Sequence, residues 1–250
     1  MLPYHVTQWV KKHPWNETTE YNARRTVYRA FSWALEEGLI AAHPLKGMKR
    51  PQPLPRQRCL SEAEFRQVLA AAHGPFRVFV WALRQTGARP SELRRLTWDQ
   101  VRYDRWVIAT HKTVRKTGKP RIVHLTAPMQ RLVEYLRRRS TSPHVFVNTR
   151  GEAWTTNALR LQMARIKTKC GLAKDVCAYL IRHAYGTQAI VNGVDPITVA
   201  ELMGHQGLDM INKVYVHLGE HQSHLQHAAE KATQRPAPPK PPASEPHRGA

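Results

Sequence analysis

The chain has 250 residues, a formal net charge of +21 and only three cysteines. Its length fits one large domain or two smaller ones. No apolar run reaches the roughly 20 residues of a membrane-spanning helix, so we expect a soluble protein. The cysteines form neither a CxxC pair nor a disulfide framework, which predicts a protein of the reducing cytoplasm. The positive charge is spread along the chain, which favours a long polyanion as partner over a merely basic surface.

Residues 1–50 are predicted to form a small helical unit. A short helical or turn segment covers residues 4–13, and a long helix covers residues 16–38, with Asn16 or Thr18 as its capping residue. Apolar side chains recur at helical spacing along this second helix and predict one buried face: Ala23, Val27, Ala30, Phe31, Ala34 and Leu35.

Two proline-rich stretches flank the larger part of the chain. Residues 51–58 are basic and interrupted by prolines, so we interpret them as an extended linker, with a loop inside one domain as the alternative. Residues 233–250 are rich in proline and poor in apolar side chains, which predicts a disordered tail.

Residues 59–232 are predicted to form the larger domain, mainly α with a small antiparallel β-sheet. Ser61 and Glu64 make a capping pattern at its first helix. Two short apolar runs around a lysine-rich loop predict a β-hairpin. The other expected elements follow in chain order: helices over 76–86, 91–96, 128–139, 155–169, 179–191, 196–203 and 217–232, with strands over 106–110 and 121–125.

The segment TGARPSEL holds the first candidate for chemistry. Arg89 precedes a proline, which keeps it out of helical geometry at a helix N-terminus, where backbone amides and a guanidinium together bind phosphate. Glu92 lies one turn on and is placed to orient Arg89. A surface arginine beside an ordinary cap is the alternative interpretation.

A second candidate is Arg182, which interrupts an otherwise apolar helix. A charge there is costly unless it is paired or faces a site, and both interpretations stay open. The hairpin lysines Lys112 and Lys116 suit either a phosphate contact or a proton donor. His205 and Tyr215, ten residues apart, are each ordinary core residues when taken alone.

Taken together and in this order, these segments resemble the tyrosine recombinase family, the phage-integrase type of site-specific recombinase. TGARPSEL is similar to the family's first arginine box and IRHAYGT to its second. LMGH, followed by YVHL, is similar to the box that carries the histidine and the nucleophile. The N-terminal unit resembles the later part of the family's helical core-binding domain. The resemblance therefore implies a partial core-binding domain followed by a catalytic domain.

The resemblance also implies a role for each candidate residue. Arg89 and Arg182 would bind the scissile phosphate, and Tyr215 would attack it to form a 3′-phosphotyrosyl link. His205 would assist proton transfer and Lys116, with Lys112 as its rival, would protonate the leaving oxygen. The supporting residues would be three: Glu92, Tyr179 and His217. Because the covalent link conserves the bond energy, the reaction requires no cofactor and no metal.

Two departures from the family pattern limit the resemblance. Tyr179 stands where the second box usually has histidine, and a phenol is a poorer general base at neutral pH. The N-terminal unit is also shorter than the usual core-binding domain. The alternative is therefore a truncated relic that binds DNA without cutting it. A metal enzyme is a further reading, because histidines recur at helical spacing: His217, His221, His224 and His227.

The resemblance finally implies the partners. Members of the family act on double-stranded DNA as homotetramers that bring two sites together, and residues 219–232 would supply the helix exchanged between subunits. We expect no small-molecule substrate, no membrane contact and a location in the cytoplasm with the nucleoid.

Overall fold

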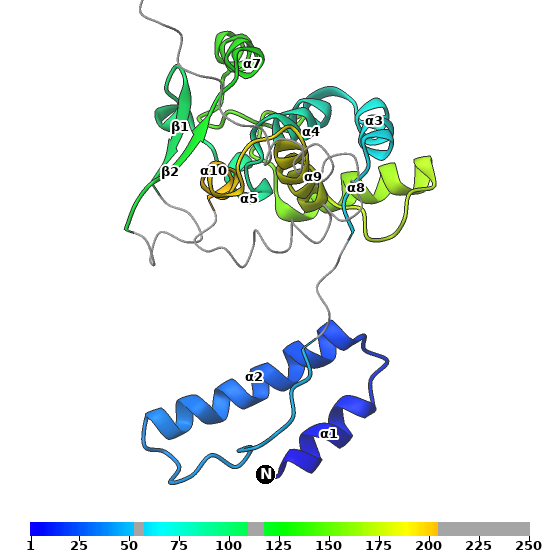
Figure 1. Ribbon diagram of the computed structural model, residues 1–250, viewed down its shortest axis with the longest axis vertical. Helices are drawn as coiled ribbons and strands as arrows, with labels where there is room; N and C mark the ends of the chain where they lie inside the picture. Colours follow the sequence, from blue (N-terminus) through cyan, green and yellow to red (C-terminus); the bar gives the residue numbers. More distant parts are fainter. Residues whose placement is uncertain (53–57, 110–117, 205–250) are drawn as a thin grey trace, which may run out of the picture. The chain divides into compact units, whose positions relative to one another are not determined.

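The computed structural model describes residues 1–52, 58–109 and 118–204 (Figure 1). The chain divides into two compact units, Met1–Arg56 and Gln57–Ala250. Within the described residues no helix is long and apolar enough to cross a membrane.

The first unit contains two helices, α1 (Pro3–Lys11) and α2 (Glu17–Glu36). Of the two capping residues expected for α2, Asn16 is the one used, since its side chain accepts a hydrogen bond from the amide of Thr19 at 2.9 Å. Four buried apolar side chains from α1 and the segment after α2 form a small core against α2: Val6, Val10, Leu45 and Met48.

The apolar face predicted for α2 is only partly covered. Val27 and Phe31 pack against the small core, whereas Leu35 is 40% exposed. The buried residue of α2 is instead Arg24, whose guanidinium donates to Glu20 and to the hydroxyl of Thr7 on α1. Hydrogen bonds of Arg24 therefore join the two helices at a place where helical spacing alone predicts apolar packing.

The second unit carries most of the described elements. In chain order these are α3 (Glu62–Ala71), α4 (Gly74–Thr86), α5 (Pro90–Leu93), the 3₁₀ turn η1 (Trp98–Gln100), β1 (Arg105–Ile108), β2 (Arg121–His124), α7 (Ala127–Arg138), α8 (Thr156–Cys170), α9 (Ala178–Val191) and α10 (Pro196–Met203).

Local sequence signals explain most of these boundaries. The Ser61 hydroxyl accepts from the amide of Glu64, whose carboxylate accepts from the amide of Ser61, so the predicted capping box is present. Thr155 caps α8. The helix predicted over 91–96 is a single turn that ends at Leu93, where Leu93 and Leu96 are both fully buried and the chain turns into η1.

The core of the second unit is mainly helical. Figure 1 shows α4 beside α9, and the two helices pack closely. Aromatic rings fill the space between α4 and the segment before α8, with the Phe76 and Trp154 rings 5.5 Å apart. Strands β1 and β2 pair antiparallel, with Ile108 opposite Arg121. The expected class, mainly α with a small antiparallel sheet, is confirmed.

Helix α10 packs against both α9 and β2. Close packing on α9 depends on Gly186, because a Cβ there would lie 2.6 Å from the sulfur of Met203. The last turn of α10 is thereby brought to the first residue of β2 and to the turn that follows α4.

Candidate functional site

Arg89 lies at the N-cap of α5, in the extended conformation expected before proline (φ −69°, ψ 142°). Its side chain is 13% exposed. One terminal nitrogen donates to Glu92 at 2.6 Å and the other donates to the carbonyl of Gly204 at 2.8 Å. This arginine thus bridges two segments that are far apart in sequence.

Glu92 is buried and holds Arg89 by two separate contacts. One carboxylate oxygen accepts from the Arg89 guanidinium and the other accepts from the Arg89 backbone amide at 2.8 Å. The second oxygen also lies 4.0 Å from Nε of Arg121. Glu92 is therefore the negative partner of two arginines.

Arg182 of α9 is 1% exposed. Its two terminal nitrogens donate to the carbonyls of Gly87 and Met203, each at 2.5 Å. Burial lowers the pKa of Arg182 to about 10, the charge of Arg89 acts in the same direction, and Glu92 opposes both. The two interpretations left open for Arg182 are not exclusive, because the residue is paired and also lies beside Arg89.

Arg121, the first residue of β2, was not a candidate in the sequence. It is 5% exposed and donates to the carbonyls of Glu201, at 3.3 Å, and Leu202. Burial lowers its pKa, against the opposing effect of Glu92. The alternation of side chains along the strand could have indicated it, because Arg121 lies two residues before Val123 and therefore on the same inner face of β2.

Arg89, Arg121 and Arg182, with Glu92, form what we call the arginine centre. All three arginines donate to backbone carbonyls at the end of α10, and Arg89 and Arg121 also lie against the carboxylate of Glu92. A cluster with excess positive charge and fixed guanidinium donors favours an anion with several acceptor oxygens, such as a phosphodiester.

Tyr185, also missed in the sequence, lies on α9 one turn after Arg182. Burial raises its pKa, and the charges of Arg121 and Arg182 counteract that rise. Its ring packs against Gly87, where an added Cβ would lie 2.3 Å from the ring. Gly87 also has φ +59°, so glycine is required there for two reasons.

Tyr179 lies at the start of α9 and is 41% exposed. Its ring meets His183 edge to face, with the centroids 4.7 Å apart. Tyr179 also interacts electrostatically with Arg182 and raises the pKa of that arginine. It therefore borders the arginine centre from the solvent side.

Several predicted residues lie outside the part of the chain that the structure describes. They are Lys112, Lys116, His205, Tyr215, His217 and the further histidines considered for a metal site. The same holds for the helix expected over 219–232 and for the tail over 233–250. In sequence, His205 directly follows Gly204.

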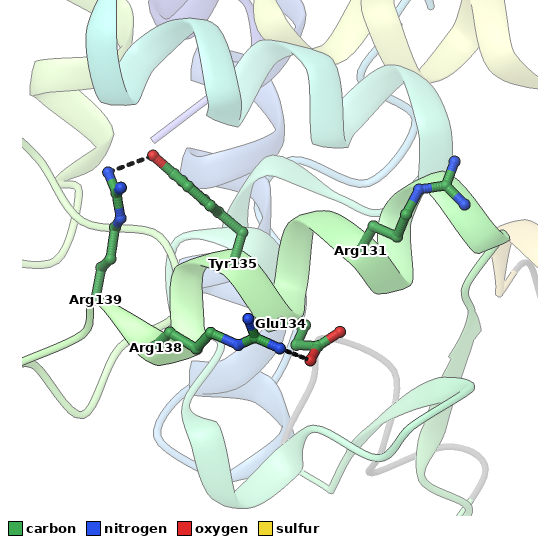
Figure 2. A pocket seen from close by; sticks show the side chains of 5 residues that line it. All are labelled: Arg131, Glu134, Tyr135, Arg138 and Arg139. Carbon is green, nitrogen blue, oxygen red and sulfur yellow. Dashed lines mark hydrogen bonds and ion pairs between the residues drawn. The ribbon is translucent and has the colours of Figure 1, made fainter.

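A second group of arginines lies on the surface of α7. A pocket of about 280 Å³ is lined by residues of this helix and its end. Figure 2 shows these residues: Arg131, Glu134, Tyr135, Arg138 and Arg139. Arg138 pairs with Glu134, and Arg139 donates to the Tyr135 hydroxyl at 2.5 Å. We call Arg131, Arg138 and Arg139 the α7 arginines.

Comparison with known proteins identifies the class to which this fold and site belong. The family model described as "Phage integrase family" matches residues 58–222, and the chain belongs to this family of tyrosine recombinases.

Individual relatives are recombinases of the Xer type. The chain is 28% identical to tyrosine recombinase XerD of Ralstonia nicotianae, over 83% of this chain and 71% of the relative. It is 30% identical to XerD of Pseudomonas aeruginosa, over 82% of this chain and 74% of the relative.

Solved structures show the same fold at lower sequence identity. A lambda integrase dimer bound to a COC′ core site is 16% identical, with a TM-score of 0.69 over 86% of this chain and 64% of that one. XerH bound to a palindromic difH substrate is 19% identical, with a TM-score of 0.68 over 94% of this chain and 73% of that one.

Proposed function

We propose that this chain is a site-specific recombinase that cleaves and rejoins double-stranded DNA through a 3′-phosphotyrosyl intermediate. The observation that carries the proposal is the arginine centre. Two arginines expected from separate sequence boxes, Arg89 and Arg182, lie together with Glu92 in a member of the phage integrase family. Such a cluster is suited to bind a phosphodiester and to stabilise the charge that builds up during its cleavage.

The chemistry assigned to the site is an exchange of esters at phosphorus. The Tyr215 oxygen would attack, a bond from phosphorus to that oxygen would form, and the bond to the 5′ oxygen would break. Lys116, or alternatively Lys112, would supply the proton that completes the 5′-hydroxyl, and His205 would assist proton transfer. His217 would support the nucleophile-bearing segment. Rejoining reverses these steps, so the proposal includes no cofactor and no metal.

Arg89 retains donors for this task. A guanidinium carries five N–H groups, and the contacts of the Arg89 side chain within the described residues use two of them. The side chain is partly exposed whereas Glu92 is buried, and we assign the remaining donors to a phosphate. Tyr179 would act as a supporting residue through its interaction with Arg182.

The proposed partner is double-stranded DNA, bound by a homotetramer that joins two sites. The net charge of +21 supports binding to a polyanion. A lambda integrase tetramer bound to a Holliday junction, with a TM-score of 0.71, supports the assembly by analogy of fold. Deleting residues 219–232 should weaken assembly more than binding to one site, and an equal loss of both would contradict the tetramer proposal.

The proposal is tested with nicked suicide DNA substrates, whose cleavage cannot be reversed, taken from sequences that flank the gene. We expect a denaturant-resistant protein–DNA adduct with the wild type and none with Tyr215→Phe. An adduct that persists in Tyr215→Phe would refute the assigned nucleophile. Salt-sensitive DNA binding without any adduct would favour the DNA-binding relic. Cleavage abolished by EDTA would favour a metal enzyme.

A further inference from the structure

We propose that Arg121 is a positioning residue for strand cleavage, which holds the last turn of α10 in register with Arg89. This inference rests on the proposed function. It adds to it a residue that does not touch the phosphate and acts instead through the groups around it.

The first observation is the capping of α10 by arginines. The final carbonyls of a helix have no partner inside the helix and carry its negative dipole end. The carbonyls of the last three residues of α10 and of its C-cap residue Gly204 each accept from an arginine of another element. Arg121 binds those of Glu201 and Leu202, whereas Met203 is bound by Arg182 and Gly204 by Arg89.

The second observation separates Arg121 from a phosphate ligand. The Arg121 side chain is 4% exposed, against 13% for Arg89. Its terminal nitrogens are used on the carbonyls of Ile122, Glu201 and Leu202. Its Nε, which makes no hydrogen bond within the described part of the chain, faces Glu92 at 4.0 Å. The guanidinium is therefore directed at protein groups.

The third observation is the direct contact between Arg121 and Gly204. A Cβ on Gly204 would lie 2.7 Å from Cδ and Nε of Arg121, and Gly204 has φ +64°. Glycine thus lets the arginine lie against the last turn of α10. The carbonyl of the same glycine accepts from Arg89, and Glu92 lies beside both arginines. Loss of Arg121 would disturb two partners of Arg89 together.

The position of Arg121 in the chain makes its contacts with the last turn of α10 relevant to catalysis. Arg121 begins β2, directly after the lysine-rich loop of the hairpin, and Gly204 directly precedes His205 in the sequence. Arg121 therefore joins the strand that follows the lysine-bearing loop to the end of α10, the helix that precedes His205. A displacement of about 1 Å in such a site can cost roughly 100-fold in rate.

The test compares Arg121→Met and Arg121→Lys with the control Arg84→Met. Arg84 is also largely buried in the second unit, where it pairs with Glu62 at 3.0 Å. We expect the single-turnover rate of adduct formation on saturating suicide DNA, per folded molecule, to fall about 100-fold in Arg121→Met. Arg121→Lys should recover part of this loss, since lysine reaches one carbonyl but cannot span two. The half-saturating DNA concentration should change less than about threefold in both.

Three results would overturn the inference. A rate loss equal to that of Arg84→Met would show a merely structural role. A large rise in the half-saturating DNA concentration, with the salt slope reduced by about one, would make Arg121 a direct phosphate contact. Unchanged hydrogen exchange of the amides in the last turn of α10 in Arg121→Met would show that Arg121 does not hold this turn in place. Absence of any adduct with the wild-type protein would instead refute the proposed function, so the two failures are distinguishable.

Discussion

The arginine centre and the α7 arginines use the same side chain in opposite environments. Arg182 is buried, and each of its terminal nitrogens meets a backbone carbonyl. Arg138, in contrast, is 76% exposed and pairs with Glu134 one turn away on the same helix. Both regions are positively charged, and charge alone does not distinguish them.

The difference lies in what fixes each guanidinium. An exposed ion pair contributes about 0–1 kcal/mol, because water and salt compete with it. A buried charge must be fully paired, and removing one partner costs about 3–5 kcal/mol. The arginines of the centre are therefore held by fixed protein partners, as the proposed binding of a reacting phosphate requires, whereas the exposed α7 arginines suit the sequence-independent attraction of a polyanion.

The largest effect is expected from Arg182→Lys. A lysine ammonium cannot reach the carbonyls of Gly87 and Met203 together. We expect adduct formation to fall by about 10²–10³-fold, comparable to losing one donor of an oxyanion hole. The free energy of unfolding should fall by about 3 kcal/mol. Single-turnover cleavage and urea unfolding measure the two effects. Arg138→Lys is the matched control, and an equal response of both variants would contradict the comparison.

Gly204→Ala should have the next largest effect. The added methyl group would meet Arg121 at 2.7 Å as well as strain a left-handed backbone. Gly171 ends α8 in the same conformation, with φ +63° and open space around it. Backbone strain alone costs roughly 1–3 kcal/mol. In thermal unfolding, Gly204→Ala should lose more stability than Gly171→Ala, and it should also lose cleavage. Equal losses would show that contact with Arg121 is unimportant.

A smaller effect concerns Tyr185 at high pH. Its folded pKa lies above the ordinary value of 10.0 because of burial. Above pH 10 the unfolded chain therefore loses this proton first, and stability falls as pH rises. Urea unfolding at pH 8 and pH 11 should show a smaller loss for Tyr185→Phe than for the wild type. Tyr135→Phe, at a half-exposed tyrosine of α7, is the control for the loss of a phenol hydroxyl. A larger loss of unfolding free energy between pH 8 and pH 11 in Tyr185→Phe than in the wild type would contradict this prediction.

The smallest effect on the fold is expected from the α7 arginines. Arg131→Ala and Arg138→Ala should change the free energy of unfolding by less than about 0.5 kcal/mol. If either side chain contacts a DNA phosphate, its loss should reduce the slope of log affinity against log salt by about one. Filter binding at several salt concentrations gives the slope. A large loss of cleavage on saturating DNA would show that these residues take part in the reaction, and would contradict the contrast with the arginine centre.

The amino-acid sequence by itself determined the local features of this protein. The Ser61 capping box and the helix ends depend on neighbours within a few residues, and the hairpin pairs two strands that are separated by a single loop. The contact between Arg89 and Glu92 is equally local, because the two residues lie three apart across one helical turn. The boxes around Arg89 and Arg182 also sufficed for the family, which the comparisons confirm.

Only the tertiary structure decided which groups meet across the fold. Arg121 looks like an ordinary strand residue until β2 and α10 are packed together and the helix end supplies its carbonyl partners. Leu35 belongs to the predicted apolar pattern yet lies exposed, whereas Arg24, which is outside that pattern, is the buried residue of α2. Helical spacing predicts which side chains share a face but does not predict what covers that face. The arginine centre exists because three distant segments converge on the last turn of one helix.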